Sequence, residues 1–194
     1  MTVSRRILTV GALMVLAAWV PARAAHAYTA NAHVAAFVEV FASGAPAEVD
    51  CPDSPEEWQL MTGAEVPDNM YGRTDIRRQV VSFRPDLCPI LDNLALSDAD
   101  NRTKALAVLV LVHESYHVRH WAWRLDEARV ECQAIRHFRA GVRILGGSAA
   151  LADRLLPFGL AWHNWITENR LFFRSSCRLP QLPTVPVESV STSR

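Results

Sequence analysis

Residues 105–117 read ALAVLVLVHESYH, an apolar run that leads directly into two histidines four positions apart. The stretch contains no glycine or proline, so one helix can continue through both histidines. Because an α-helix has about 3.6 residues per turn, His113 and His117 lie on the same face. The two imidazoles can therefore bind one metal ion, and this helix is the element around which we expect the domain to fold.

Glu114 follows the first histidine and completes an H-E-x-x-H pattern. In zinc hydrolases this spacing supplies two metal ligands and a carboxylate that reaches a water on the ion. The alternative is a chance match on an exposed helix. The preceding apolar run and the acidic residues that follow favour the metal-site interpretation.

The length of 194 residues is enough for one domain with a sizeable core. The formal net charge is zero, and no basic block or aromatic–basic pattern indicates a nucleic-acid partner. The hydrophobic fraction of 50% is raised by the N-terminal segment, so it does not indicate a membrane protein. We expect a monomer.

The first 27 residues have the features of a secretory signal peptide. Arg5 and Arg6 precede an apolar segment, residues 7–20, that is too short to span a bilayer comfortably. Residues 22–24 and 25–27 both fit the small-x-small cleavage pattern. We expect an exported chain without stable membrane insertion after cleavage; an uncleaved N-terminal anchor is the alternative. Residues 28–178 then form the predicted zincin-like catalytic domain, and the Pro- and Ser-rich residues 179–194 a disordered tail.

Four cysteines lie in the predicted mature chain, and none belongs to a C-x-x-C pair. An even number in an exported protein favours two disulfides, for which three pairings exist. We favour Cys51–Cys88, which would hold the N-terminal half together, and Cys132–Cys177, which would hold the helices behind the site.

Hydrophobic periodicity predicts a mostly α-helical, α+β domain. The active helix should run from about 102 to 120, and Ser97, Asp98 and Asp100 offer N-cap oxygens. One strand is expected at 75–83, as a short β-strand or part of a small antiparallel sheet at the cleft. Pro157 should kink or split the last helix. Further helices are predicted at 30–41, 56–61, 87–96, 125–145 and 148–173.

A hydrolytic zinc site needs a third protein ligand. His120 lies about 10 Å along the helix axis from His113, so we assign it to the rim. Glu127 and Glu131 are four apart and share a helix face. A tight turn near 121–124 would fold their helix back antiparallel, so that one carboxylate binds zinc and the other accepts a hydrogen bond from a ligating imidazole. The alternative is an ordinary solvated face.

The combination of His113-Glu114-x-x-His117 with Glu127-x-x-Val130-Glu131 resembles the Glu-zincin metalloproteases, in particular those with an E-x-x-A-D second motif. The resemblance implies that Glu127 is the zinc ligand and that Glu131 orients a histidine. The sequence departs from the pattern at Glu131, where the family has Asp, and at Val130, where it has a small residue. Because Glu131 replaces the aspartate, the two carboxylates can exchange roles, and Glu131 stays open as the alternative third ligand. The gap after His117 is also short for the family, and no N-E-x-x-S-D motif is present.

The Asp-Glu-Ala-x-x-Glu-Cys motif at 126–132 also resembles small exported actinobacterial proteins with an uncharacterised zinc-protease-like domain. The expected function is a secreted zinc metallopeptidase with Glu114 as general base, acting on a peptide, a protein or a cell-wall peptide. His163, His137, Tyr71 and Tyr116 are candidates for the oxyanion donor, and the sequence does not choose among them; a core residue is an equal alternative for His163. The alternatives are a non-catalytic secreted domain stabilised by zinc and disulfides, and a membrane-tethered structural protein if the signal is retained.

Overall fold

The computed structural model describes residues 32–63, 70–123, 126–169 and Cys177. The predicted signal peptide and C-terminal tail lie outside these residues. Helix α4 (Asn101–Arg119) forms the centre, and 14 of its 19 residues are buried. A helix that is buried nearly all round must be covered on every side by other elements. This explains why the run of apolar residues before His113 shows no polar face.

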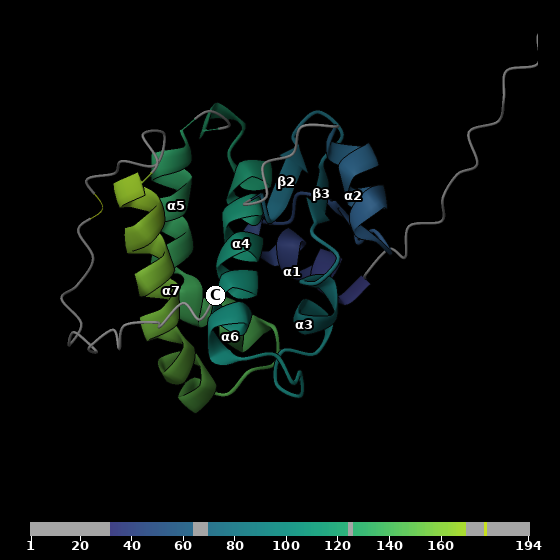
Figure 1. Ribbon diagram of the computed structural model, residues 1–194. Helices are drawn as coiled ribbons and strands as arrows, with labels where there is room; N and C mark the ends of the chain where they lie inside the picture. The colour runs from purple at the N-terminus through teal and green to yellow at the C-terminus, as the bar shows by residue number, and fades with distance from the viewer. Residues whose placement is uncertain (1–31, 64–69, 124–125, 170–176, 178–194) are drawn as a thin grey trace, which may run out of the picture.

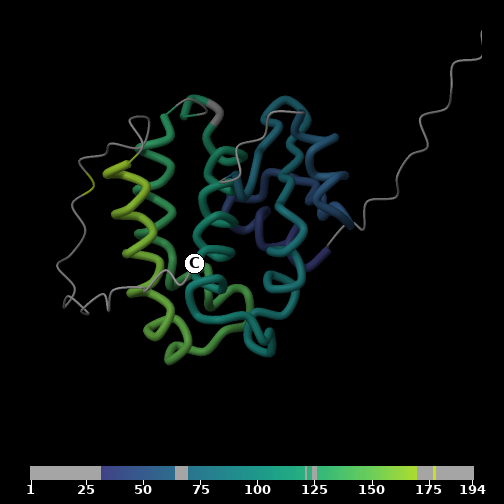
Figure 2. Tube along the Cα trace, in the orientation of Figure 1, coloured from purple at the N-terminus to yellow at the C-terminus, as the bar shows by residue number. Residues whose placement is uncertain are grey.

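Two groups of elements cover α4 (Figures 1 and 2). Helices α5 (Glu127–Arg136), α6 (Phe138–Ile144) and α7 (Ala149–Asn169) pack on one side. On the other side lie α1 (Ala32–Phe41), α3 (Cys88–Asp92) and a small sheet, with α2 (Pro55–Thr62) at the periphery. The predicted class, mostly helical with a small sheet, is confirmed.

The sheet has the strand order β1-β3-β2. Strand β1 (Glu48–Asp50) pairs parallel to β3 (Val80–Phe83), and β2 (Gly72–Asp75) pairs antiparallel to β3. The prediction of one strand over 75–83 is therefore wrong, because this segment contains the end of β2, a turn and β3. Asp75 accepts hydrogen bonds from the backbone N–H groups of Arg77 and Arg78, and Gln79 has a φ of 54°. An aspartate that bonds the backbone ahead of it ends a strand and begins a turn.

The predicted antiparallel helix hairpin is confirmed: α4 and α5 are joined by a short 3₁₀ turn, Trp121–Trp123, and run in opposite directions (Figure 1). The ring of Trp123 stacks on His120, with centroids 3.7 Å apart, and the Arg129 guanidinium lies 3.9 Å above the same ring. Stacking of this kind and the cation–π contact stabilise the turn. His120 thus belongs to the turn between the two helices.

The single helix predicted over 125–145 is divided at His137 into α5 and α6. Both the N–H of His137 and its Nδ1 lie at hydrogen-bond distance from the carbonyl of Gln133, and Tyr116 contacts the same ring nitrogen. In contrast, α7 runs through Pro157 without splitting. One lost backbone hydrogen bond is tolerated there because α7 packs on both α4 and α6.

Both predicted disulfides are present. Cys51–Cys88 joins β1 to α3, and Cys132–Cys177 joins α5 to the segment beyond α7. Two disulfides favour an extracellular or otherwise oxidising environment. Among the described helices, none combines the length and apolar character needed to cross a bilayer.

Candidate metal centre

The helix hairpin brings together the side chains of His113, His117 and Glu127. Nε2 of His113 lies 3.2 Å from Nε2 of His117. Oε2 of Glu127 lies 3.1 Å from the first nitrogen and 3.3 Å from the second. Three electron-rich atoms thus form a nearly equilateral triangle, and these residues can hold a metal ion.

The size of this triangle matches a small tetrahedral ion. Ligand atoms about 2.0 Å from zinc in a tetrahedral site lie about 3.3 Å from one another. The three measured edges, 3.1, 3.2 and 3.3 Å, agree with that value. Two imidazoles and one carboxylate therefore have both the donor types and the spacing of a three-ligand site.

The carboxylates around His113 favour a positive charge in the site. Burial alone would lower the pKa of His113, but hydrogen bonds with Glu127 and Glu131 and the charge of Glu114 raise the pKa to about 10. Burial would raise the pKa of Glu127, but its contacts with His113 and His117 hold the pKa of that carboxyl well below its usual range. A buried cluster of carboxylates and imidazoles is stable when a positive charge, a proton or a metal ion, occupies it.

Glu131 lies behind this group. Its Oε2 is 3.0 Å from Nδ1 of His113, the ring nitrogen that does not face Glu127. Its side chain is 3% exposed, against 30% for Glu127. Contacts with His113 and His163 outweigh burial and hold the pKa of Glu131 below its usual range. Of the two acids, only Glu127 belongs to the group that can hold a metal.

Glu114 is held by the sheet. Its Oε2 accepts a hydrogen bond of 2.6 Å from the Thr74 hydroxyl of strand β2. A Cβ atom at Gly72 would lie 2.7 Å from Cγ1 of Val110 and 3.1 Å from Oε1 of Glu114. Glycine at this position therefore allows β2 to approach α4 closely enough for Thr74 to reach the glutamate.

The four candidates for an oxyanion donor have different surroundings. The Tyr116 hydroxyl lies 2.9 Å from Nδ1 of His137, so these two residues contact each other. Tyr71 meets the ring of Trp162 edge-on, with centroids 5.4 Å apart. His163 is buried and pairs with Glu131. In the described residues, none of the four belongs to the metal-holding group.

Sequence reasoning missed Thr74 and Gly72 altogether, and it considered His163 as an oxyanion donor or an ordinary core residue. No spacing relates these residues to the motif, because each reaches it through tertiary packing.

His117 differs from His113 in one respect: within the described residues, its Nδ1 is buried without a hydrogen-bond partner.

Comparisons of the chain with protein-family models, with curated proteins and with solved structures gave no match. The functional argument therefore rests on the geometry of the site itself.

Proposed function

We propose that this chain is a secreted zinc-dependent metallohydrolase and that it cleaves peptide bonds. One observation carries the proposal. The triangle of His113, His117 and Glu127 has the edges of a tetrahedral zinc site, and a glutamate held by a strand follows the first histidine. A purely structural metal site needs no such glutamate.

Zinc is the metal that the donor set favours. Two imidazoles and one carboxylate are a typical ligand set of catalytic zinc, which keeps its fourth position open. Softer sites use thiolates, but all four cysteines of this chain are in disulfides. When bound, zinc polarises a carbonyl group and lowers the pKa of a water that it coordinates.

Glu114 is the proposed general base and acid. Its carboxylate takes a proton from the water whose oxygen attacks the carbonyl carbon, and it delivers a proton to the amine as the C–N bond breaks. The Thr74 hydroxyl holds Oε2 of this carboxylate in one place. Glu131 accepts a hydrogen bond from His113 and so orients that ligand.

Export is supported by the two disulfides and by the signal-like residues 1–27. The proposed substrate is a peptide or protein, and for an exported enzyme a cell-wall peptide is included. We propose that the chain works as a monomer, with no nucleic-acid partner and no stable membrane insertion.

The test uses the mature chain with both disulfides intact. Bound zinc is measured by elemental analysis, and wild type is compared with Glu114→Gln on a peptide library. We expect both forms to hold one zinc and only wild type to cleave. A wild type without zinc rejects the site. Zinc in both forms with cleavage by neither rejects the enzyme and favours a non-catalytic binding domain stabilised by zinc and disulfides.

A further inference from the structure

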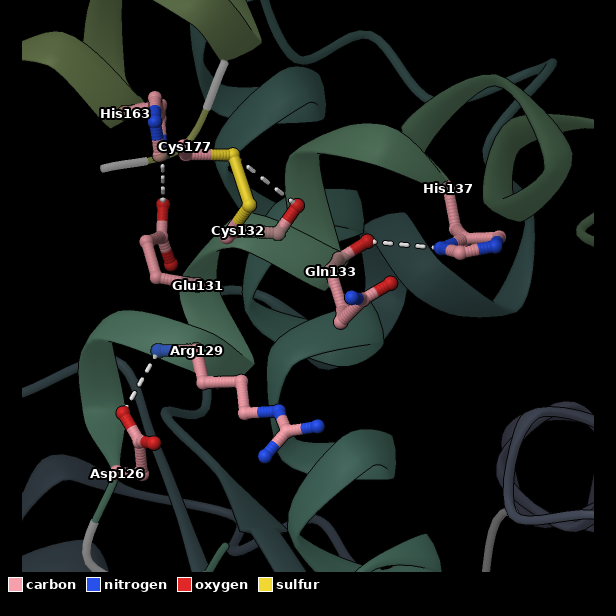
Figure 3. Close-up of a disulfide and its surroundings, with 8 residues drawn as sticks. All are labelled: Asp126, Arg129, Glu131, Cys132, Gln133, His137, His163 and Cys177. Atoms are coloured by element: carbon pink, nitrogen blue, oxygen red, sulfur yellow. Dashed lines mark hydrogen bonds and ion pairs between the residues drawn. A yellow bond between two sulfur atoms is a disulfide. The ribbon is translucent and has the colours of Figure 1, made fainter. Parts of the chain in front are cut away.

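Glu131 is held between two buried imidazoles. Its Oε2 lies 3.0 Å from Nδ1 of His113, and its Oε1 lies 3.0 Å from Nδ1 of His163 (Figure 3 shows the second pair). The side chains of Glu131 and His163 are 3% and 4% exposed. Both oxygens of the carboxylate are therefore engaged by ring nitrogens away from solvent.

The hydrogen-bonding capacity of these groups determines which ring nitrogens carry a proton. An ionised carboxylate only accepts, so both Nδ1 atoms must donate to Glu131. When a metal ion replaces the proton on Nε2, His113 keeps its remaining proton on Nδ1, and the Nε2 lone pair faces His117 and Glu127. The contact with Glu131 thus selects the tautomer of His113 that can bind a metal.

A single hydrogen bond would leave the carboxylate of Glu131 free to turn about its own axis. The second one, to His163, removes that freedom, because turning would leave a buried nitrogen or oxygen unpaired. The buried carboxylate therefore has one orientation, with Oε2 directed at His113 and away from the metal-holding triangle.

His163 is itself well anchored on α7. One turn before it, Gly159 faces Phe138 of α6, and a Cβ atom there would lie 3.0 Å from Cε2 of the phenyl ring. Helix α7 also packs along α4 and α5. The disulfide of Cys132, the residue after Glu131, joins α5 to Cys177 (Figure 3). These contacts keep the imidazole at a fixed place relative to Glu131.

We propose that His163 is a positioning residue that acts through Glu131. It keeps Glu131 as the hydrogen-bond acceptor of His113 and leaves Glu127 as the carboxylate of the metal site. This inference rests on the proposed zinc site and adds a residue to it, 32 positions from Glu131 in the sequence.

The test measures zinc affinity of the oxidised chain by competition with a chromophoric chelator. His163→Leu should weaken zinc binding about 10- to 100-fold, as loss of an outer partner of a ligand does. His163→Asn should restore most of the affinity, because its amide nitrogen takes the place of Nδ1. His33→Leu is the control: it removes an exposed histidine of α1 that lies outside the metal-holding group, and it should leave zinc affinity unchanged.

Dependence on Glu131 is tested by a double-mutant cycle. In a Glu131→Ala background, His163→Leu should change zinc affinity by less than about threefold, because its partner is already absent. The same loss in both backgrounds would show that His163 acts by another route and would overturn the proposal. Wild-type affinity in His163→Leu alone would also overturn it.

A measurement on wild type covers the case in which His163→Leu does not fold. Ring-nitrogen NMR of the zinc-loaded chain should show protons on Nδ1 of both His113 and His163. A proton on Nε2 alone of His163 overturns the proposal, while the zinc site stands. If wild type binds no zinc at all, the proposed function fails together with this inference.

Discussion

The hydroxyl of Thr74 donates a hydrogen bond of 2.6 Å to Oε2 of Glu114, and it joins the edge strand β2 to the helix that carries both histidines. The two residues are 40 positions apart in the sequence. This hydrogen bond links the sheet to the proposed general base. Such a link matters because a carboxylate that transfers protons must be held in one orientation.

Thr74→Val removes this hydroxyl and keeps the shape of the side chain. A hydrogen bond to a charged group is worth about 1.5–3 kcal/mol, so peptide cleavage should fall about 10- to 100-fold. Zinc affinity should stay at the wild-type value, because Thr74 contacts none of the three proposed ligands. Thr62→Val is the control, since within the described residues its hydroxyl donates to the carbonyl of Trp58 in α2. Equal activity of wild type and Thr74→Val would contradict the proposed role.

Gly72→Ala tests the close approach of β2 to α4. The added methyl group would meet Val110 and Glu114, and such overpacking costs about 1–3 kcal/mol of stability. Gly141→Ala, in α6, is a matched control. A Cβ atom there would also meet helix α4, 2.7 Å from Cγ2 of Val112, but it would not contact Glu114. Both variants should lose stability in chemical denaturation. Only Gly72→Ala should lose cleavage beyond its loss of folded protein; equal losses would contradict the model of a positioned base.

The group of side chains that can hold a metal and the hairpin were predictable because they depend on local periodicity. His113 and His117 share a helix face by their spacing, and the short turn after them returns Glu127 to the same level. Thr74, Gly72 and His163 were not predictable, because they reach the motif from other elements through packing alone. Their sequence neighbourhoods contain no signal that distinguishes them from ordinary strand and core residues.

Two element boundaries were missed for a common reason. At Asp75 and at His137, a polar side chain hydrogen-bonds the nearby backbone and ends the element there. Helical periodicity continues across His137, so the pattern predicts one long helix there. The strand over 75–83 was predicted from its β-branched residues and the proline after it, although its alternation is imperfect. Competition from side-chain-to-backbone hydrogen bonds decides the outcome at such positions.

Alanine substitution of Glu127 and of Glu131, made separately, distinguishes the roles of the two residues. Glu127→Ala removes a proposed ligand, whereas Glu131→Ala removes a partner of His113 and should weaken zinc binding about 10- to 100-fold. We therefore expect the loss of zinc affinity to be clearly larger for Glu127→Ala in chelator competition. The reverse order would exchange the two roles and make Glu131 the ligand.

The two disulfides provide an internal comparison. Their sequence separations, 37 for Cys51–Cys88 and 45 for Cys132–Cys177, predict similar losses of about 4 kcal/mol when each pair is replaced by serine. Cys132 is the residue after Glu131, so loss of Cys132–Cys177 should weaken zinc binding by about tenfold, whereas loss of Cys51–Cys88 should not. Denaturation curves and chelator competition on both double variants check this. Equal zinc affinity in the two variants would show that the disulfide does not support the site.

Asp100 caps the central helix and gives a pH-dependent contribution to stability. Its Oδ1 accepts a hydrogen bond of 2.7 Å from the N–H of Thr103, and this bond lowers the pKa of Asp100 below its ordinary value of 3.8. A lowered folded-state pKa means that the stabilisation is fully present above the unfolded-state pKa and is lost as the pH falls through the folded-state value. Asp100→Ala should cost about 1 kcal/mol at pH 7. Asp100→Asn keeps the cap without the charge, so its difference from wild type in urea denaturation should disappear as the pH falls through the folded-state pKa of Asp100. The contrary result is that wild type and Asp100→Asn differ in free energy of unfolding by the same amount at pH 7 and in acid. That result would show that the charge of Asp100 does not contribute to the stabilisation.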